Sequence, residues 1–308
     1  MAAWRLALEL AEFQVEVSRI IALPDRSRGV ALIALGALLF AIMGAMAKGA
    51  SASIPTFELV AARSAVTLVA MEGLRRKLQV PLVFFDWPVL ASRTIAGFVA
   101  IACYFDALRF IPLGEAVLLN NMSPVLTSVA AVGLLGETLS KIRIVALVAS
   151  FAGLWLLVGQ RHGDSTQNYG AWLGAASAVA SAWALISLKK AAKRNRSLLI
   201  VWALAATSTV GSLILADSNW IVPDSREAVL LLGTGLAAAM AQLLMTSGYR
   251  LLDASEASVY AFLTPLFSML LGGVLFAEWP GPQAMAGGLL IVAAGIAVAV
   301  RGKPAKPA

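Results

Sequence analysis

Arg63 is the residue of this chain best suited to binding chemistry, because it stands inside a long apolar segment, 57–74. An ionisable side chain in such a segment costs at least about 2.5–3.5 kcal/mol in lipid and marks a functional site by default. Its planar guanidinium suits a carboxylate or another anionic group. The alternative interpretation is an ion pair of Arg63 with Asp106 or Glu58 that only locks helices together.

Four further polar residues share the depth of Arg63, which is about six residues, or roughly 9 Å, below the predicted outer end of its segment. Tyr104 and Asp106 are near the outer end of the third apolar segment. Asn120 and Asn121 are about two turns into the fourth. If these faces converge, they form a polar substrate-binding pocket beneath the outer surface.

The second half of the chain offers Gln242, Tyr260 and Thr264, which lie near the midplane of the eighth and ninth apolar segments. We expect them to complete the cavity from the cytoplasmic side. Ser177 and Ser181 in the sixth segment are weaker candidates, because small residues there often serve close helix packing.

Two prolines, Pro124 and Pro265, are expected near the centres of the fourth and ninth segments, where each removes one backbone hydrogen bond. In lipid, a freed backbone group is tolerated only where protein or a water-filled cavity satisfies it. We therefore predict a pair of bends that open and close the cavity. Static kinks are the alternative.

The acidic residues Glu115 and Glu256 are predicted to cap helices rather than to couple protons. Both fall in the first turn of a predicted helix, where the macrodipole stabilises a carboxylate by roughly 0.3–1 kcal/mol. Asp253 precedes Glu256 at the spacing of a capping box. Glu137 and Glu278 end the same two segments, and we expect them to anchor the next loop or helix start.

Ten apolar segments position these residues. Of the 308 residues, 60% are hydrophobic and 13% charged, whereas soluble domains are roughly half apolar and a quarter charged. A membrane-spanning helix needs about 20 mostly apolar residues. The sequence thus predicts an all-α integral membrane protein with helices at 29–48, 57–74, 89–109, 113–136, 142–160, 170–190, 198–216, 228–249, 254–276 and 283–301.

Positive charge sets the predicted orientation, because Lys and Arg favour cytoplasmic loops. With the N-terminus inside, most Lys and Arg residues fall on the cytoplasmic side. Both termini are therefore predicted to be cytoplasmic, in a bacterial-type cytoplasmic (inner) membrane. Residues 1–28 form an amphipathic extension, which either lies on the membrane surface or is dispensable.

Several kinds of chemistry are disfavoured by the residue inventory. One cysteine, Cys103, and one histidine, His162, cannot build a disulfide framework or a Cys/His metal site. The net charge of +7 resides in loops rather than on one soluble face, which argues against nucleic acid. No phosphate-binding loop is present, so ATP is not expected to act directly, and no cofactor is predicted. No apolar segment holds an acidic cluster or a histidine, which argues against a membrane enzyme.

An internal repeat relates the two halves of the chain. Arg109, Glu115, Pro124 and Glu137 recur 141 residues later as Arg250, Glu256, Pro265 and Glu278. Each half contains five predicted helices, and an odd number means that counterparts cross the membrane in opposite directions. Inverted repeats are the architecture of alternating-access carriers, which bind a solute near the midplane.

Residues 107–137, with their Leu-Gly-Glu-Ala, Ser-Pro and Gly-Glu elements, resemble the EamA-type domain of the drug/metabolite transporter superfamily, and the second half resembles it again. The resemblance implies two domains, 29–160 and 170–301, a central cavity, and peripheral fifth and tenth helices whose small residues suit helix contact or a homodimer. It implies a secondary transporter for a small metabolite such as an amino acid or organic anion. A channel or receptor is the alternative.

Overall fold

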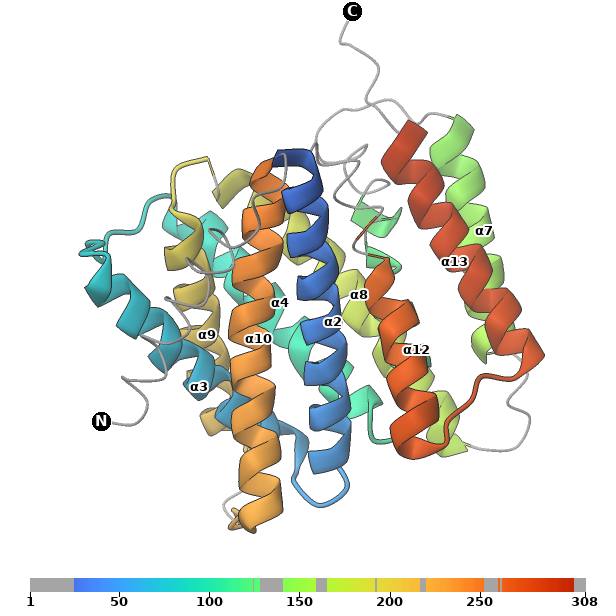
Figure 1. The fold of residues 1–308 in the computed structure, drawn as a ribbon, viewed down its shortest axis with the longest axis horizontal. Helices are drawn as coiled ribbons and strands as arrows, with labels where there is room; N and C mark the ends of the chain where they lie inside the picture. Colours follow the sequence, from blue (N-terminus) through green and yellow to red (C-terminus); the bar gives the residue numbers. More distant parts are fainter. Residues whose placement is uncertain are drawn as a thin grey trace, which may run out of the picture.

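The computed structural model describes residues 25–123, 125–127, 141–158, 165–191, 193–216, 220–251, 260 and 262–301. Within these residues the chain forms α-helices joined by short connections, and no β-strand. Figure 1 shows the helices packed into one bundle. They are α2 (Asp25–Ala50), α3 (Thr56–Lys77), α4 (Trp87–Ala107), α5 (Leu113–Asn120), α7 (Lys141–Val158), α8 (Ser165–Ala191), α9 (Ser197–Leu215), α10 (Ser225–Leu251), α12 (Leu263–Phe276) and α13 (Pro282–Arg301).

Proline marks the start of several helices. Pro55 and Pro112 are the N-cap residues of α3 and α5, Pro88 lies in the first turn of α4, and Pro282 begins α13. The missing N–H of proline is harmless at these positions, because the first N–H groups of a helix have no intrahelical partner. The sequence therefore places these helix starts by local chemistry alone.

The fourth predicted helix, 113–136, is interrupted in the structure. α5 ends at Asn120, and the N–H of Met122 bonds to the carbonyl three residues earlier, at 3.0 Å, as in a tight turn. The side-chain amide of Asn121 donates to the carbonyl four residues earlier, at 2.9 Å. Such local side-chain bonds compete with the helical ladder. The sequence predicts one bent helix here, whereas the structure breaks it at Asn121 and Met122. Residues 124 and 128–136 lie outside the described residues.

The sequence predicts Pro265 near the centre of the ninth helix, but the described part of that helix places it elsewhere. α12 begins at Leu263 after the N-cap residue Phe262, so Pro265 falls in the first turn. There its missing N–H removes no intrahelical bond. Residues 252–259 lie outside the described part of the chain.

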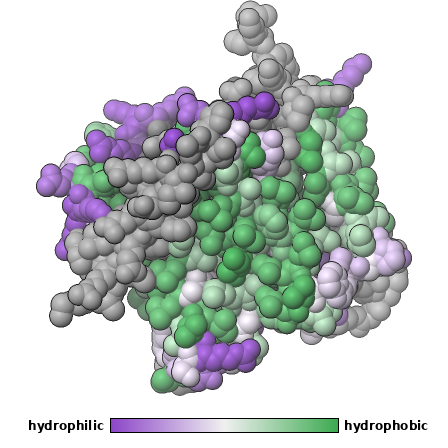
Figure 2. Space-filling view, in the orientation of Figure 1, coloured by the Kyte–Doolittle hydropathy of each residue, from purple (hydrophilic) through white to green (hydrophobic). Residues whose placement is uncertain are grey.

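Five described helices are long and apolar enough to cross a membrane: Asp25–Ala50, Trp87–Ala107, Ser165–Leu188, Ser197–Leu215 and Ser225–Met245. α3 is not in this group, because Glu58, Arg63 and Glu72 interrupt its apolar stretch. Figure 2 shows hydrophobic side chains over the middle of one face and hydrophilic ones gathered towards its ends. This surface suits a hydrocarbon layer between two aqueous ones.

Helix packing follows the 141-residue repeat. α2 packs against α10, and their repeat counterparts α8 and α4 pack against each other. The pairs α3 with α9, α5 with α12, and α7 with α13 each join two counterparts. Successive helices alternate in direction through the bundle (Figure 1). This arrangement is the one that two inverted halves produce.

The small residues predicted for helix contact or dimerisation are used within the chain. A Cβ at Gly153 of α7 would stand 2.6 Å from the carbonyl oxygen of Gly287, so α7 and α13 cross at backbone distance. Gly288 of α13 packs against Leu118 of α5. Close approach of this kind is the usual role of small residues between membrane helices. These contacts stabilise the bundle itself, and the homodimer stays a prediction.

Candidate functional site

Arg63 is buried within the bundle, with 4% of its surface exposed. It projects from α3, whose neighbour α10 approaches so closely that a Cβ at Gly235 would lie 2.9 Å from the Arg63 carbonyl oxygen. The Nε of Arg63 has no hydrogen-bond partner, and the side chain forms no ion pair with any described residue. Because a guanidinium stays charged in proteins, its burial without a counter-charge calls for a partner from outside the described chain.

The ion pairs that would make Arg63 a structural lock are absent from the described residues. Asp106 accepts a hydrogen bond from Thr56 Oγ1 at 2.6 Å and lies 3.8 Å from Arg109 Nη1. Thr56 is the first residue of α3, and Arg109 follows the end of α4. Glu58 accepts hydrogen bonds from the connection between α9 and α10. The alternative of a structural lock therefore finds no ion pair among the described residues, because Asp106 contacts the start of α3 rather than its interior.

Among the described residues, the other polar residues of the first half bond to partners other than Arg63. The hydroxyl of Tyr104 faces α2, where a Cβ at Gly44 would stand 2.7 Å from it. Asn120 donates from Nδ2 to Ser177 and Ser181 of α8, at 3.1 Å each. Ser177 and Ser181, the weaker candidates of the sixth segment, are thus hydrogen-bonded to Asn120. Asn121 is occupied with the turn that ends α5.

From the second half, Tyr260 packs beside Ile33 of α2 and Met245 of α10. Gln242 and Thr264 are partly buried on α10 and α12. No hydrogen bond within the described residues joins them to Arg63, and their place in a cavity wall stays a prediction. Pro124, Asp253 and Glu256 lie outside the described residues.

Arg93 is a second, partly buried cation within an apolar helix, and the sequence interpretation did not single it out. It falls in the predicted third segment, 89–109, and in the structure it lies in α4, one of the helices suited to crossing a membrane. Its Nε is buried and has no hydrogen-bond partner. Counting residues from Trp87 places it about 9 Å inside the helix. The same count of residues from the start of the helix can be made from the sequence, so the depth of Arg93 could have been predicted.

The end of the bundle that the sequence predicts to be the outer one carries a polar cluster that we call the outer latch: Lys48, Glu278 and the carbonyls of Leu108 and Ile111. Lys48 Nζ donates to the two carbonyls at 3.1 and 2.8 Å and lies 2.8 Å from Glu278 Oε1. The other carboxylate oxygen of Glu278 accepts from the N–H of Leu113 at 3.0 Å. Glu278 therefore caps α5, a helix of the opposite half, in addition to Glu115 in its first turn. The sequence predicts that Glu278 anchors the next loop or helix start, whereas the structure places it at the start of α5 in the other half of the chain.

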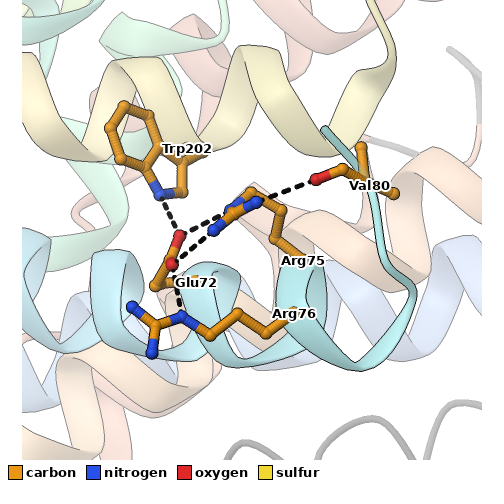
Figure 3. Close-up of polar contacts among 5 residues, drawn as sticks. All are labelled: Glu72, Arg75, Arg76, Val80 and Trp202. Atoms are coloured by element: carbon orange, nitrogen blue, oxygen red, sulfur yellow. Dashed lines mark hydrogen bonds and ion pairs between the residues drawn. The ribbon is translucent and has the colours of Figure 1, made fainter. Parts of the chain in front are cut away.

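Carboxylates also join α3 to α9 at both ends. Near the start of α3, Glu58 accepts from the N–H of Ile221, which follows α9, at 3.1 Å. Near the end of α3, Glu72 accepts from Trp202 Nε1 of α9 at 3.0 Å and pairs with Arg75 and Arg76 at 2.7 Å (Figure 3). The close-up also shows Arg75 donating to the Val80 carbonyl, at 2.9 Å. Two helices fastened at both ends move together more readily than apart.

Comparison with known proteins identifies the family. The family model described as the EamA-like transporter family matches residues 27–159 and again 168–301. The chain belongs to the EamA-like transporter family. Its two matched regions are the two halves related by the 141-residue repeat. As a member of this family, the protein is a secondary membrane transporter and not an enzyme.

Relatives of this EamA-like transporter carry different solutes. The pseudopaline exporter CntI of Pseudomonas aeruginosa is 31% identical over 271 residues, covering 88% of this chain and 95% of that protein. The riboflavin transporter of Vibrio cholerae is 25% identical, covering 83% and 87%. An S-adenosylmethionine uptake transporter of Rickettsia prowazekii is 23% identical, covering 66% and 68%. A solved crystal structure, 23% identical, matches the fold with a TM-score of 0.62 over 89% of this chain.

Proposed function

We propose that the protein exports a small, carboxylate-bearing metabolite across the cytoplasmic membrane by alternating access between two inverted five-helix halves. The observation that carries the substrate class is Arg63, buried and without a protein counter-charge among the described residues. A carboxylate can take both Nη donors of a guanidinium at once, which offsets the cost of burying the charge. Export is favoured by the likeness to the pseudopaline exporter along nearly its whole length.

The ten-helix architecture is part of this proposal. Five described helices are long enough to span, and three shorter apolar helices stand beside them: Ile144–Gly153, Leu263–Phe276 and Pro282–Ala297. The pairing of repeat counterparts supports two inverted halves. Such halves rock against each other around a central site. Termini on the cytoplasmic side follow from the charge bias of the loops.

Transport into inside-out vesicles tests the proposal, with labelled pseudopaline, riboflavin and S-adenosylmethionine supplied separately. We expect accumulation of an anionic solute, with Arg63→Leu abolishing it at matched membrane abundance. Arg63→Lys should rescue poorly, because an ammonium cannot reproduce a planar two-point contact. Arg226→Leu is the matched control, since it makes the same chemical change at an exposed position. Unchanged transport by Arg63→Leu would reject the role of Arg63.

A further inference from the structure

The crossing of α4 with α9 holds the guanidinium of Arg93. A Cβ at Gly97 of α4 would collide with Arg93 Nη1 and would stand 2.7 Å from Leu204 Cδ1 of α9. Gly97 therefore leaves the space in which the Arg93 side chain lies along its own helix, next to Leu204. The acidic residues that flank the α3–α4 connection have other partners, because Glu72 pairs with Arg75 and Arg76, and Asp86 with Arg194 at 3.0 Å.

The repeat shows that this crossing has a counterpart, which is the crossing of α3 with α10. Both pairs of helices pack against each other. Leu204 is the residue 141 positions after Arg63, so the two occupy equivalent places on α9 and α3. Each crossing thus contains one guanidinium without a described counter-charge, Arg63 from α3 in one and Arg93 from α4 in the other. The two arginines are not at equivalent positions of the 141-residue repeat, but each crossing contains one arginine side chain.

Arg63 and Arg93 are rooted in the first halves of α3 and α4, two consecutive helices that start from opposite ends of the bundle. The Cα of Arg63 is about 10 Å from the start of α3, and the Cα of Arg93 is about 9 Å from the start of α4. The side chain of Arg93 reaches further along its helix, because its Nη1 lies beside Gly97, the middle residue of α4.

We propose that Arg93 is a second carboxylate-binding subsite, which receives the substrate from the cytoplasm and passes it to Arg63 on the outer side. This inference rests on the proposed function and adds the side from which each arginine is reached. Each guanidinium can serve as the counter-charge of the substrate carboxylate in its own crossing, so the substrate finds a cation on either side of the transport step. Two equivalent crossings in inverted halves place one such subsite towards each side of the membrane.

Side-resolved transport tests the subsite, with labelled pseudopaline as the probe and with purified protein in sealed vesicles of both orientations. Arg93→Leu should raise the half-saturating concentration at least tenfold when the probe is on the cytoplasmic side, and much less when it is on the outer side. Arg63→Lys, which should leave some transport, should show the reverse preference. Equal effects of Arg93→Leu from both sides, or none, would overturn the proposal.

A rescue variant asks whether the crossing, rather than one residue, is the subsite. Leu204→Arg in the Arg93→Leu background returns a guanidinium to the same crossing from the other helix, as Arg63 does in its own. We expect cytoplasmic-side affinity to recover. A double variant that is as abundant as Arg93→Leu and no better at transport would reject the equivalence of the two crossings.

Thermal unfolding separates this inference from the proposed function. A cation without a counter-charge destabilises the empty protein, so Arg93→Leu should melt no lower than the parent in low-salt detergent without substrate. A lower melting temperature would assign Arg93 to structure and overturn the subsite. If none of the three labelled solutes is transported, the proposed function fails, and the melting comparison still decides the role of Arg93.

Discussion

Lys48→Met should open the end of the transporter at which Lys48 lies, which the sequence predicts to be the outer one. One ammonium group joins the end of α2 to the α4–α5 connection and, through Glu278, to the α12–α13 connection. Methionine keeps the length of the side chain but donates nothing, so two carbonyls and one carboxylate oxygen lose their donor. We expect the latch to form only while this end is closed, so its loss should raise the free energy of the closed state relative to the open one.

The size of the effect follows from burial. A hydrogen bond to a charged group contributes about 1.5–3 kcal/mol, and removing one partner of a fully buried ion pair costs about 3–5 kcal/mol. The side chains of Lys48 and Glu278 are 13% and 23% exposed, so water compensates part of the loss. We expect about 2–3 kcal/mol, which raises the ratio of open to closed protein about 30- to 150-fold.

Cysteine labelling measures this ratio. In a Cys103→Ala background, Ser51→Cys places a thiol at a position that is 5% exposed beside the latch. Its reaction rate with a membrane-impermeant maleimide follows the open fraction when opening is faster than labelling. Lys48→Met should raise the rate by the factor above. Val222→Cys, at a position that is 88% exposed, is the control and should label equally in both backgrounds.

Glu278→Gln is the graded variant, because an amide oxygen still accepts from the Leu113 N–H while the ionic contact to Lys48 is lost. It should raise labelling by a smaller factor. Equal labelling of Ser51→Cys with Lys48 and with Lys48→Met, in protein that is folded and abundant, would refute the latch.

Four further variants test individual contacts. Glu72→Gln should lower the free energy of unfolding by about 1–3 kcal/mol, because it loses two ionic contacts. Trp202→Phe should lower it by about 1 kcal/mol, because it loses one hydrogen bond. Calorimetry in detergent that ranked the two variants in the opposite order would contradict this account. Asn120→Leu should weaken transport by leaving two serine hydroxyls without their donor, as measured by uptake at matched abundance. Pro265→Ala should fold normally, since its position in the first turn needs no N–H, and should change the rate of transport if this segment bends during the cycle; wild-type rates would assign the proline to static structure.

The position of the break at the end of α5 could not be predicted from the sequence. Proline at 124 was a clear signal for an irregularity, but the interruption comes earlier, at Asn121 and Met122. The decisive contact is the bond from the Asn121 amide to a backbone carbonyl. Asn is also found inside helices, so its type alone does not reveal which bond it makes.

The membrane class, most of the helices, the repeat and the family were readable from the sequence alone. Each of these depends on local properties, namely the length and composition of a segment and the spacing of recurring residues, because hydrocarbon requires every spanning segment to satisfy its own backbone. The depth of Arg63 followed in the same way from the rise of 1.5 Å per residue. Arg93 was accessible by the same count.

The partners of the charges were decided only by the tertiary structure. Depth counting gives the height of a residue in the membrane, whereas its neighbours depend on the rotation of the helix, and one residue turns the side chain by about 100°. For this reason Asp106 meets Thr56 instead of Arg63, and Glu278 caps α5 from the other half of the chain. The tilt and rotation of packed helices are set by all their contacts together, so these pairings emerge only when the bundle is complete.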